Sequence, residues 1–202
     1  MKLKQLIIFT LALVFFSQTS FADDYESQPD DGGGLIYSRT LGATVYGSFQ
    51  LVNTPPDLDP GIGAGLFFDN RFNERFSIAI EAFGITQDGD GADSAEGSIE
   101  FFAIPTATIK LYPLNTTSKV DPYIGIGIGL YLLTEGNVNN DSFGIGLGAQ
   151  IETGLDYLVT DTLTLSVGGV YRSVGLLNSL SGTANATTYM PYTLFGRIGY
   201  KF

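Results

Sequence analysis

The segment Pro122–Leu133 alternates strictly between two kinds of residue. Its apolar parity holds Ile124, Ile126, Ile128, Leu130 and Leu132, and its other parity holds Tyr123, Gly125, Gly127, Gly129 and Tyr131. Successive side chains of a β-strand point to opposite faces, so a period of two predicts a strand here. One face of this strand is strongly apolar and the other is nearly bare. The two faces must therefore contact two different environments.

The pattern recurs in Phe143–Tyr157, where the parity opposite the aliphatic residues becomes polar. That parity contains Gly144, Gly146, Gly148, Gln150, Glu152 and Asp156. In a soluble, half-buried strand the apolar face packs on a protein core. In a membrane barrel the apolar face meets lipid and the polar face lines the interior.

Composition excludes several classes of function. Hydrophobic residues make up 44% of the chain and charged residues only 15%, which is low for a soluble domain. The chain has no cysteine and no histidine. It therefore lacks disulfides, thiol nucleophiles, and the commonest general base and metal ligand. A net charge of −11 disfavours nucleic acid as a partner, and no cofactor or metal is expected.

The N-terminus predicts an export signal. Two lysines precede a short apolar run at 6–16, and Ser-Phe-Ala then precedes Asp23 and Asp24, as in a secretory signal peptide. We expect residues 1–22 to be removed. The mature chain then has eight bases against 21 acids, a charge of 8 − 21 = −13. Residues 23–39 are acidic and aperiodic, which predicts a flexible periplasmic leader.

Eight alternating runs follow the leader, each near the ~9–11 residues that a tilted membrane-spanning strand needs. They cover 41–52, 61–69, 76–86, 98–112, 122–133, 143–157, 163–173 and 191–202. Short connections at 70–75 and 159–162, and one of intermediate length at 113–121, alternate with longer ones at 53–60, 87–97, 134–142 and 174–190. Outer-membrane barrels have this alternation of short turns and long loops. Pro105 interrupts the fourth run, which suggests a β-bulge.

The charged residues decide between the soluble and the membrane interpretation. Within the runs, every charge lies on the parity opposite the aliphatic residues: Glu81, Glu100, Lys110, Glu152, Asp156, Arg172, Arg197 and Lys201. A soluble barrel shows the reverse, with charges outside. We predict an all-β fold, an eight-stranded antiparallel up-and-down transmembrane β-barrel over residues 40–202. A two-sheet sandwich is the alternative.

The closing segment Tyr192–Phe202, together with Pro122-Tyr-Ile-Gly-Ile-Gly and the segment 154–161, carries a family resemblance. The chain resembles the small eight-stranded bacterial outer-membrane barrels, the group that contains the OmpA membrane domain, OmpX and OmpW. The resemblance implies location in the bacterial outer membrane and contact with its lipid and lipopolysaccharide. It also implies that Tyr200 and Phe202 form the signal that the barrel-insertion machinery reads.

The predicted interior allows two interpretations at two places. The eight charges form either an ion-selective constriction or a plug of salt bridges, because unpaired buried charges are costly. The glycines at 125, 127, 129, 144, 146 and 148 leave one wall without side chains. This wall lines a small cavity or makes room for rings from across the barrel, such as Tyr46, Phe67 and Phe102.

Two functions remain open at this point. The first is a structural barrel or a narrow channel for small or apolar solutes. The second is a surface-binding or adhesion protein acting through extracellular loops 87–97 and 174–190. No enzyme is expected, since the enzymes known on such barrels depend on histidine. The acidic loop 88–93 is either a solvated loop or a divalent-cation site, although it does not match the EF-hand spacing.

Overall fold

A computed structural model describes residues 38–50, 60–89, 97–114, 119–136, 142–178 and 185–202. Nine strands run through these residues, each antiparallel to its neighbours. They are β1 (Ser38–Gln50), β2 (Gly61–Arg71), β3 (Phe76–Gly89), β4 (Gly97–Leu111), β5 (Val120–Gly136), β6 (Ser142–Leu158), β7 (Leu163–Asn178), β8 (Asn185–Tyr189) and β9 (Pro191–Lys201). In the part of the chain that is described, no helix is long and apolar enough to cross a bilayer.

The strands close into a barrel of eight. From β1 to β8 each strand pairs with the next in sequence, and β9 pairs with β1 on one side and β7 on the other. β8 and β9 are two parts of one strand, since Tyr189 pairs with Val174 and Tyr192 with Tyr171 in one continuous register. Pro191 has no N–H for the ladder at this point. The predicted eight-stranded antiparallel barrel is confirmed.

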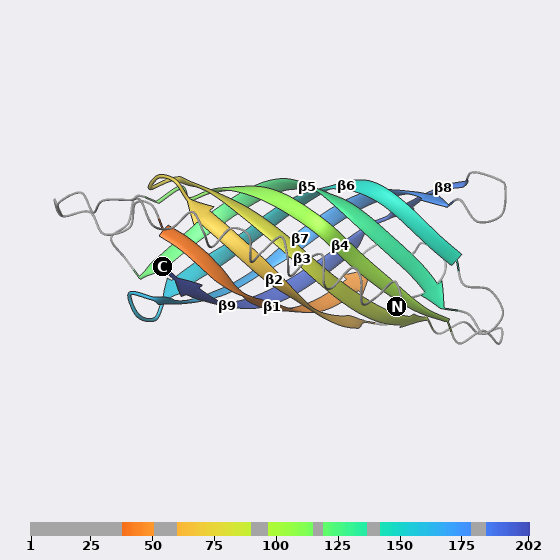
Figure 1. The fold of residues 1–202 in the computed structure, drawn as a ribbon, viewed down its shortest axis with the longest axis horizontal. Coiled ribbons are helices and arrows are strands. Elements are labelled where there is room, and N and C mark those ends of the chain that lie inside the picture. The colour runs from red at the N-terminus through yellow and green to blue at the C-terminus, as the bar shows by residue number, and fades with distance from the viewer. Residues whose placement is uncertain (1–37, 51–59, 90–96, 115–118, 137–141, 179–184) are drawn as a thin grey trace, which may run out of the picture. The chain divides into compact units, whose positions relative to one another are not determined.

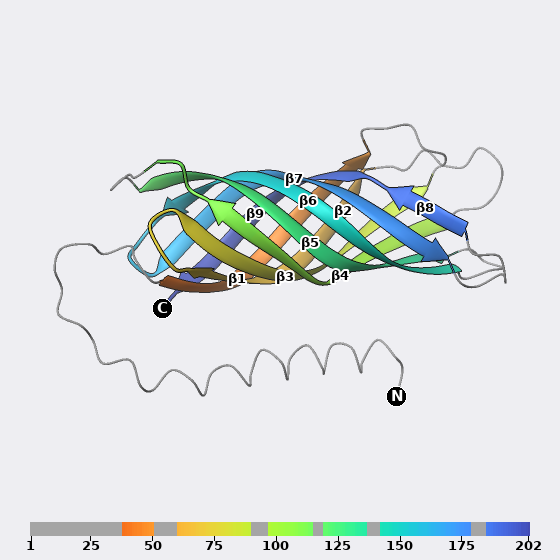
Figure 2. The ribbon, with the colours of Figure 1, turned by 90° about the horizontal axis from the view of Figure 1, so that it is seen from above.

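The barrel has two distinct ends, and its strands are inclined to its axis (Figure 1). The turn end holds the start of β1, the end of β9 and the described turns 72–75 and 159–162. The opposite end, which we call the loop end, holds the end of β1, the start of β2, the end of β3 and the start of β4. β8 lies at the loop end, away from the C-terminus, in both views (Figure 1, Figure 2).

Several strands are longer than their alternating runs. β3 continues to Gly89, β5 to Gly136 and β7 to Asn178, and β8 lies within the predicted loop 174–190. That loop prediction was partly wrong. Backbone pairing does not require an apolar face, so polar residues extend the wall at the loop end. At the other end β1 begins at Ser38, two positions before the expected boundary. Residues 1–37 lie outside the described residues.

The bulge predicted at Pro105 is confirmed, and it changes which side chains of β4 point inward. Between Ala103 and Thr106 the register of β4 shifts by one residue against both β3 and β5. Phe101 and Ala103 are consequently buried on the same side as Thr106. Alternation counted straight through Pro105 predicts Phe101 and Ala103 on the apolar outer face of this run, and that prediction is wrong. One extra residue reverses the inside and outside parities of a strand.

Candidate functional site in the barrel interior

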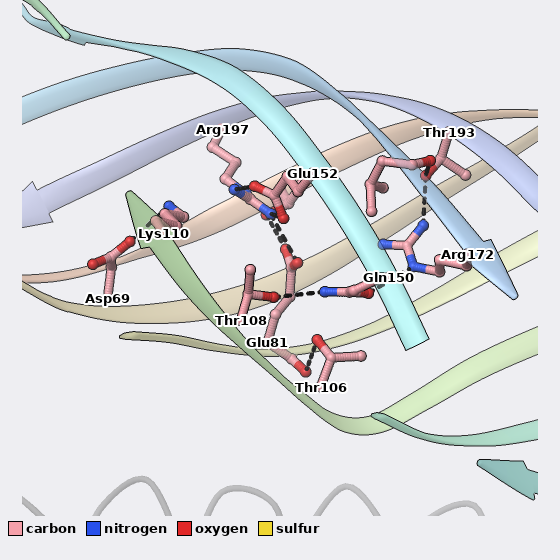
Figure 3. A network of polar contacts seen from close by, with 12 residues as sticks. Asp69, Glu81, Thr106, Thr108, Lys110, Gln150, Glu152, Arg172, Thr193 and Arg197 are labelled. Carbon is pink, nitrogen blue, oxygen red and sulfur yellow. Dashed lines mark hydrogen bonds and ion pairs between the residues drawn. The ribbon is translucent and has the colours of Figure 1, made fainter. Parts of the chain in front are cut away.

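The middle of the barrel is spanned by an arginine between two glutamates (Figure 3). Arg197 on β9 lies 2.9 Å from Glu81 on β3 and 2.5 Å from Glu152 on β6. The hydroxyl of Thr44 donates to Glu81 at 2.7 Å, and that of Tyr123 donates to Glu152 at 2.6 Å. The two acids thus have hydrogen-bond donors besides Arg197, as buried charges require. We call Glu81, Glu152 and Arg197 the central triad.

A second ion pair lies beside the central triad. Lys110 on β4 is 2.6 Å from Asp69 on β2, and both residues are buried. The Lys110 ammonium also lies 4.5 Å from the ring centroid of Tyr123, which already bonds the triad. An ammonium over an aromatic face is attracted by the ring quadrupole. This ion pair therefore extends the network of buried polar side chains that begins at the central triad.

The buried Arg172 is held by neutral groups. Its Nε donates to the Gln150 side-chain oxygen at 3.2 Å, and its Nη1 donates to the Thr193 hydroxyl at 2.5 Å. Its guanidinium carbon lies 4.4 Å from the ring centroid of Phe83. Gln150 in turn donates to Thr108 at 2.6 Å. These contacts connect β3, β4, β6, β7 and β9 across the interior (Figure 3).

Toward the loop end the interior becomes aromatic. The rings of Phe101 and Tyr131 stack with centroids 5.1 Å apart, and Tyr189 packs on Phe101 at 5.0 Å. The hydroxyl of Tyr189 donates to the side chain of Gln87 on β3. Tyr131 donates to Gln150 at 3.1 Å, which connects this aromatic layer to the Arg172 cluster.

The turn end contains a cavity of about 80 Å³. Asp121 on β5 forms an ion pair with Arg71 at 2.8 Å, and Tyr112 donates to Asp156 at 2.9 Å. The cavity is also lined by three lysines, Lys110, Lys119 and Lys201, and by four hydroxyl side chains, Ser38, Thr40, Thr164 and Ser166. We call it the turn-end cavity.

Most of the predicted interior charges lie inside the barrel. Glu81, Lys110, Glu152, Arg172 and Arg197 are buried there, and the half-buried Asp156 and Lys201 line the turn-end cavity. Glu100 is the exception. It precedes the bulge on the parity opposite the buried Phe101, so it points outward, and it accepts a bond from Thr134 at 3.4 Å. The prediction that Glu100 lies in the interior is wrong, because it counts the alternation straight through the bulge at Pro105.

Three residues that carry interior contacts were missed. Asp69 and Asp121 lay at the ends of predicted runs or turns, and Arg71 lay in the predicted turn 70–75. All three continue the inward parity of their strands. Asp69 is the last residue of the predicted run 61–69 and shares the parity of Phe67, so the alternation itself indicated its inward position.

The predicted glycine wall faces inward, and part of it is filled from neighbouring strands. A Cβ on Gly129 or Gly148 would lie 2.9 Å from the Tyr131 ring, and one on Gly127 would lie 2.6 Å from the Ala107 carbonyl oxygen. These glycines make room for Tyr131 and for the neighbouring backbone. Phe102 does not contribute, because it lies outside the barrel over Gly84.

The described residues hold no group of three or more acidic side chains arranged for a metal ion. Residues 90–93 of the acidic loop 88–93, and the side chain of Asp88, lie outside the residues whose structure is described.

The distribution of exposure decides what surrounds the barrel. Ile62, Ile128 and Leu147 are 78%, 71% and 74% exposed, whereas Arg172 is 0% and Glu152 1% exposed. A protein in water exposes its charged side chains and buries its apolar ones, whereas a barrel in lipid shows the arrangement seen here, with apolar side chains outside and charges inside.

The family model of the outer membrane protein beta-barrel domain matches residues 8–202. The chain belongs to this family. Its place is therefore the bacterial outer membrane.

Solved structures show the same fold at low sequence identity. Neisserial surface protein A is 19% identical with a TM-score of 0.56, covering 84% of this chain and 98% of that one. OprG from Pseudomonas aeruginosa is 18% identical with a TM-score of 0.54, covering 83% and 96%. Outer membrane protein W of E. coli is 18% identical with a TM-score of 0.53, covering 83% and 98%. A search of curated proteins gives no match.

Proposed function

We propose that the protein is a structural outer-membrane barrel with a closed lumen, its turn end in the periplasm. The observation that carries this proposal is the central triad, in which Arg197 joins opposite walls through Glu81 and Glu152. Short turns of such barrels face the periplasm and longer loops face outward. In this orientation the turn-end cavity opens toward the periplasm.

The filling on both sides of the triad supports a closed lumen. An eight-stranded barrel encloses a space just wide enough for side chains. Arg172 and the stacked Phe101 and Tyr131 occupy that space toward the loop end. A solute crossing the barrel would have to separate these contacts as well as the triad. A narrow channel is therefore the less supported of the two functions in this class.

Planar-bilayer recording on the refolded barrel tests the proposal. We expect no steady openings from the wild-type protein. Steady openings that are abolished by Gly127→Leu or Gly146→Leu would contradict it and favour a channel. Gly196→Ala is the matched control, because a Cβ there contacts only Val45, at 3.7 Å. Heat-modifiable gel mobility establishes that each variant is folded before it is recorded.

A second candidate function is surface binding at the loop end. Residues 50–61, 86–100, 134–143 and 173–190 contain nine acids and no lysine or arginine. One solved structure of this fold is the attachment invasion locus protein of Yersinia pestis in complex with a heparin analogue. A heparin analogue is polyanionic and does not suit an acidic loop end. We infer that any extracellular partner is cationic or neutral.

Binding of labelled cells or peptides to the barrel in proteoliposomes tests this second function. We expect a lysine-rich peptide to bind and heparin not to bind, with both tested at physiological salt. Shortening these loops only within 90–96 and 179–184, which leaves β3, β4, β7 and β8 intact, should remove the binding. Heparin binding by the wild-type protein would contradict the inference.

The acidic loop end also bears on lipopolysaccharide as a partner. Without a lysine or arginine there, the chain offers no direct cationic contact to lipid phosphates. We propose that its acids meet those phosphates through shared divalent cations and that its apolar outer face meets the acyl chains. Removal of Mg²⁺ with a chelator should weaken lipopolysaccharide binding to the barrel. Binding that is unchanged by the chelator would oppose this arrangement.

A further inference from the structure

The turn-end cavity contains two neighbouring carboxylates. Asp121 and Asp156 are register partners on β5 and β6, and both line the cavity. Like charges directly opposite each other on a strand pair repel. Arg71 pairs with Asp121 through Oδ2, and Asp156 accepts a bond from the neutral Tyr112. Among the described residues, Arg71 is therefore the one base that forms an ion pair with either of these two carboxylates, and it pairs with Asp121.

Asp121 is also incompletely satisfied. It is 8% exposed, and its Oδ1 is buried without a hydrogen-bond partner. A buried carboxylate oxygen without a donor is costly. Each nitrogen of Arg71 already contacts an oxygen, of Asp121 Oδ2, the Asn73 carbonyl or the Glu74 carbonyl, and no bond from Arg71 reaches Oδ1. A compact donor such as a primary ammonium would satisfy Oδ1 and also offset the charge of the neighbouring Asp156.

The bases of the cavity restrict the ligand further. Lys119 lies one inward position closer to the turn end than Asp121 and is exposed, and Lys201 is the last residue of β9. Lys110 is already bound to Asp69. A simple cation would be repelled by these lysines. A molecule with an ammonium at one end and an acidic group at the other matches both parts of the cavity.

We propose that the turn-end cavity binds a small zwitterion that carries a primary ammonium and a phosphate or carboxylate group. The ammonium bonds Asp121 and Asp156, and the acidic group lies between Lys119 and Lys201. The central triad closes the cavity toward the loop end, so the ligand enters and leaves on the turn side. This inference is independent of whether the barrel conducts.

The test is an NMR titration of ¹⁵N-labelled protein refolded in an uncharged maltoside detergent. The probe is ethanolamine phosphate, with ethanolamine alone and inorganic phosphate alone as half-ligands at equal ionic strength. We expect saturable amide shifts at Asp121, Asp156 and Lys201, and binding at least about tenfold weaker for each half-ligand. Asp156→Asn should weaken binding by about the same factor, through loss of one charged contact.

Glu74→Gln is the matched control, because Glu74 is exposed in the turn 72–75 at the same end of the barrel and does not line the cavity. Its affinity should equal that of the wild-type protein. If Asp156→Asn does not refold, Lys201→Gln tests the acidic subsite in the same way. Shifts that sodium chloride reproduces, or equal losses in Asp156→Asn and Glu74→Gln, would overturn the proposal.

The same chemistry is present in a free solute and in an ethanolamine lipid headgroup. Nanodiscs with and without phosphatidylethanolamine distinguish these two sources. If the amide signals of the cavity residues shift without added probe, and only in nanodiscs that contain phosphatidylethanolamine, the lipid headgroup is the ligand. Shifts that require added ethanolamine phosphate in both lipids identify a free solute. Absence of shifts in every arm would refute the site.

Discussion

Nη2 of Arg197 lies 2.9 Å from Oε2 of Glu81, although 116 residues separate the two positions in the chain. The contact joins β9 to β3 across the interior, and Glu152 adds a third wall on β6. A buried pair of this kind contributes little net stability against an apolar replacement. Breaking it is costly, because the remaining charges stay buried.

Replacement of Arg197 by methionine should destabilise the barrel by about 3–5 kcal/mol, since two facing carboxylates then lose their common base. Urea unfolding of the protein in lipid vesicles measures this loss. The combined variant Arg197→Met, Glu81→Gln, Glu152→Gln should recover most of it. A combined variant as unstable as the single one would mean that the charges are not coupled as the distances indicate.

Gly127→Ala should destabilise the barrel by about 1–3 kcal/mol, because the added methyl group would lie 2.6 Å from the Ala107 carbonyl oxygen. Gly196→Ala, with its nearest contact at 3.7 Å, should change the unfolding free energy by less than about 0.5 kcal/mol. Equal effects of the two substitutions would show that the wall is not filled as described.

The bulge at Pro105 makes a prediction about neighbouring residues of β4. Spin labels on single cysteines are specific in this chain, which has no native cysteine. A label at 102 should be accessible to oxygen dissolved in lipid, and a label at 101 should not. Labels at 107 and 109 should both be accessible. If the label at 101 were accessible to oxygen and the label at 102 were not, β4 would alternate without interruption and the bulge would be refuted.

The sequence predicted most of the strands of the barrel wall, but few of the side-chain contacts inside the barrel. The outward faces of β1, β2, β5, β6 and β9 follow directly from alternation, since lipid selects one parity of each strand. On the N-terminal side of Pro105 the same reasoning failed for Phe101, Ala103 and Glu100. Composition and spacing do not encode which acid meets Arg197, because strand tilt and shear set those partners. The role of Asp121 depends on its register with Asp156, which no local pattern shows.

The closing strand carries the proposed assembly signal. The rings of Tyr200 and Phe202 are exposed and lie 6.5 Å apart. We expect Phe202→Ala to lower the amount of folded barrel in the outer membrane while leaving the refolded protein nearly as stable in vitro. Pulse-labelled fractionation with heat-modifiable mobility measures the first quantity, and urea unfolding measures the second. Normal assembly of Phe202→Ala in cells would remove the residue from the signal.

The account depends above all on the apolar outer face meeting lipid, and the absence of native tryptophan allows a direct measurement. Single tryptophans at Val45, Ile126 and Leu147 are introduced, and their fluorescence is recorded in vesicles of brominated phospholipid. We predict strong quenching at all three positions, with little quenching of a tryptophan at the buried Tyr131. Unquenched fluorescence at the three outer positions, in protein that remains folded without detergent or lipid, would contradict the account.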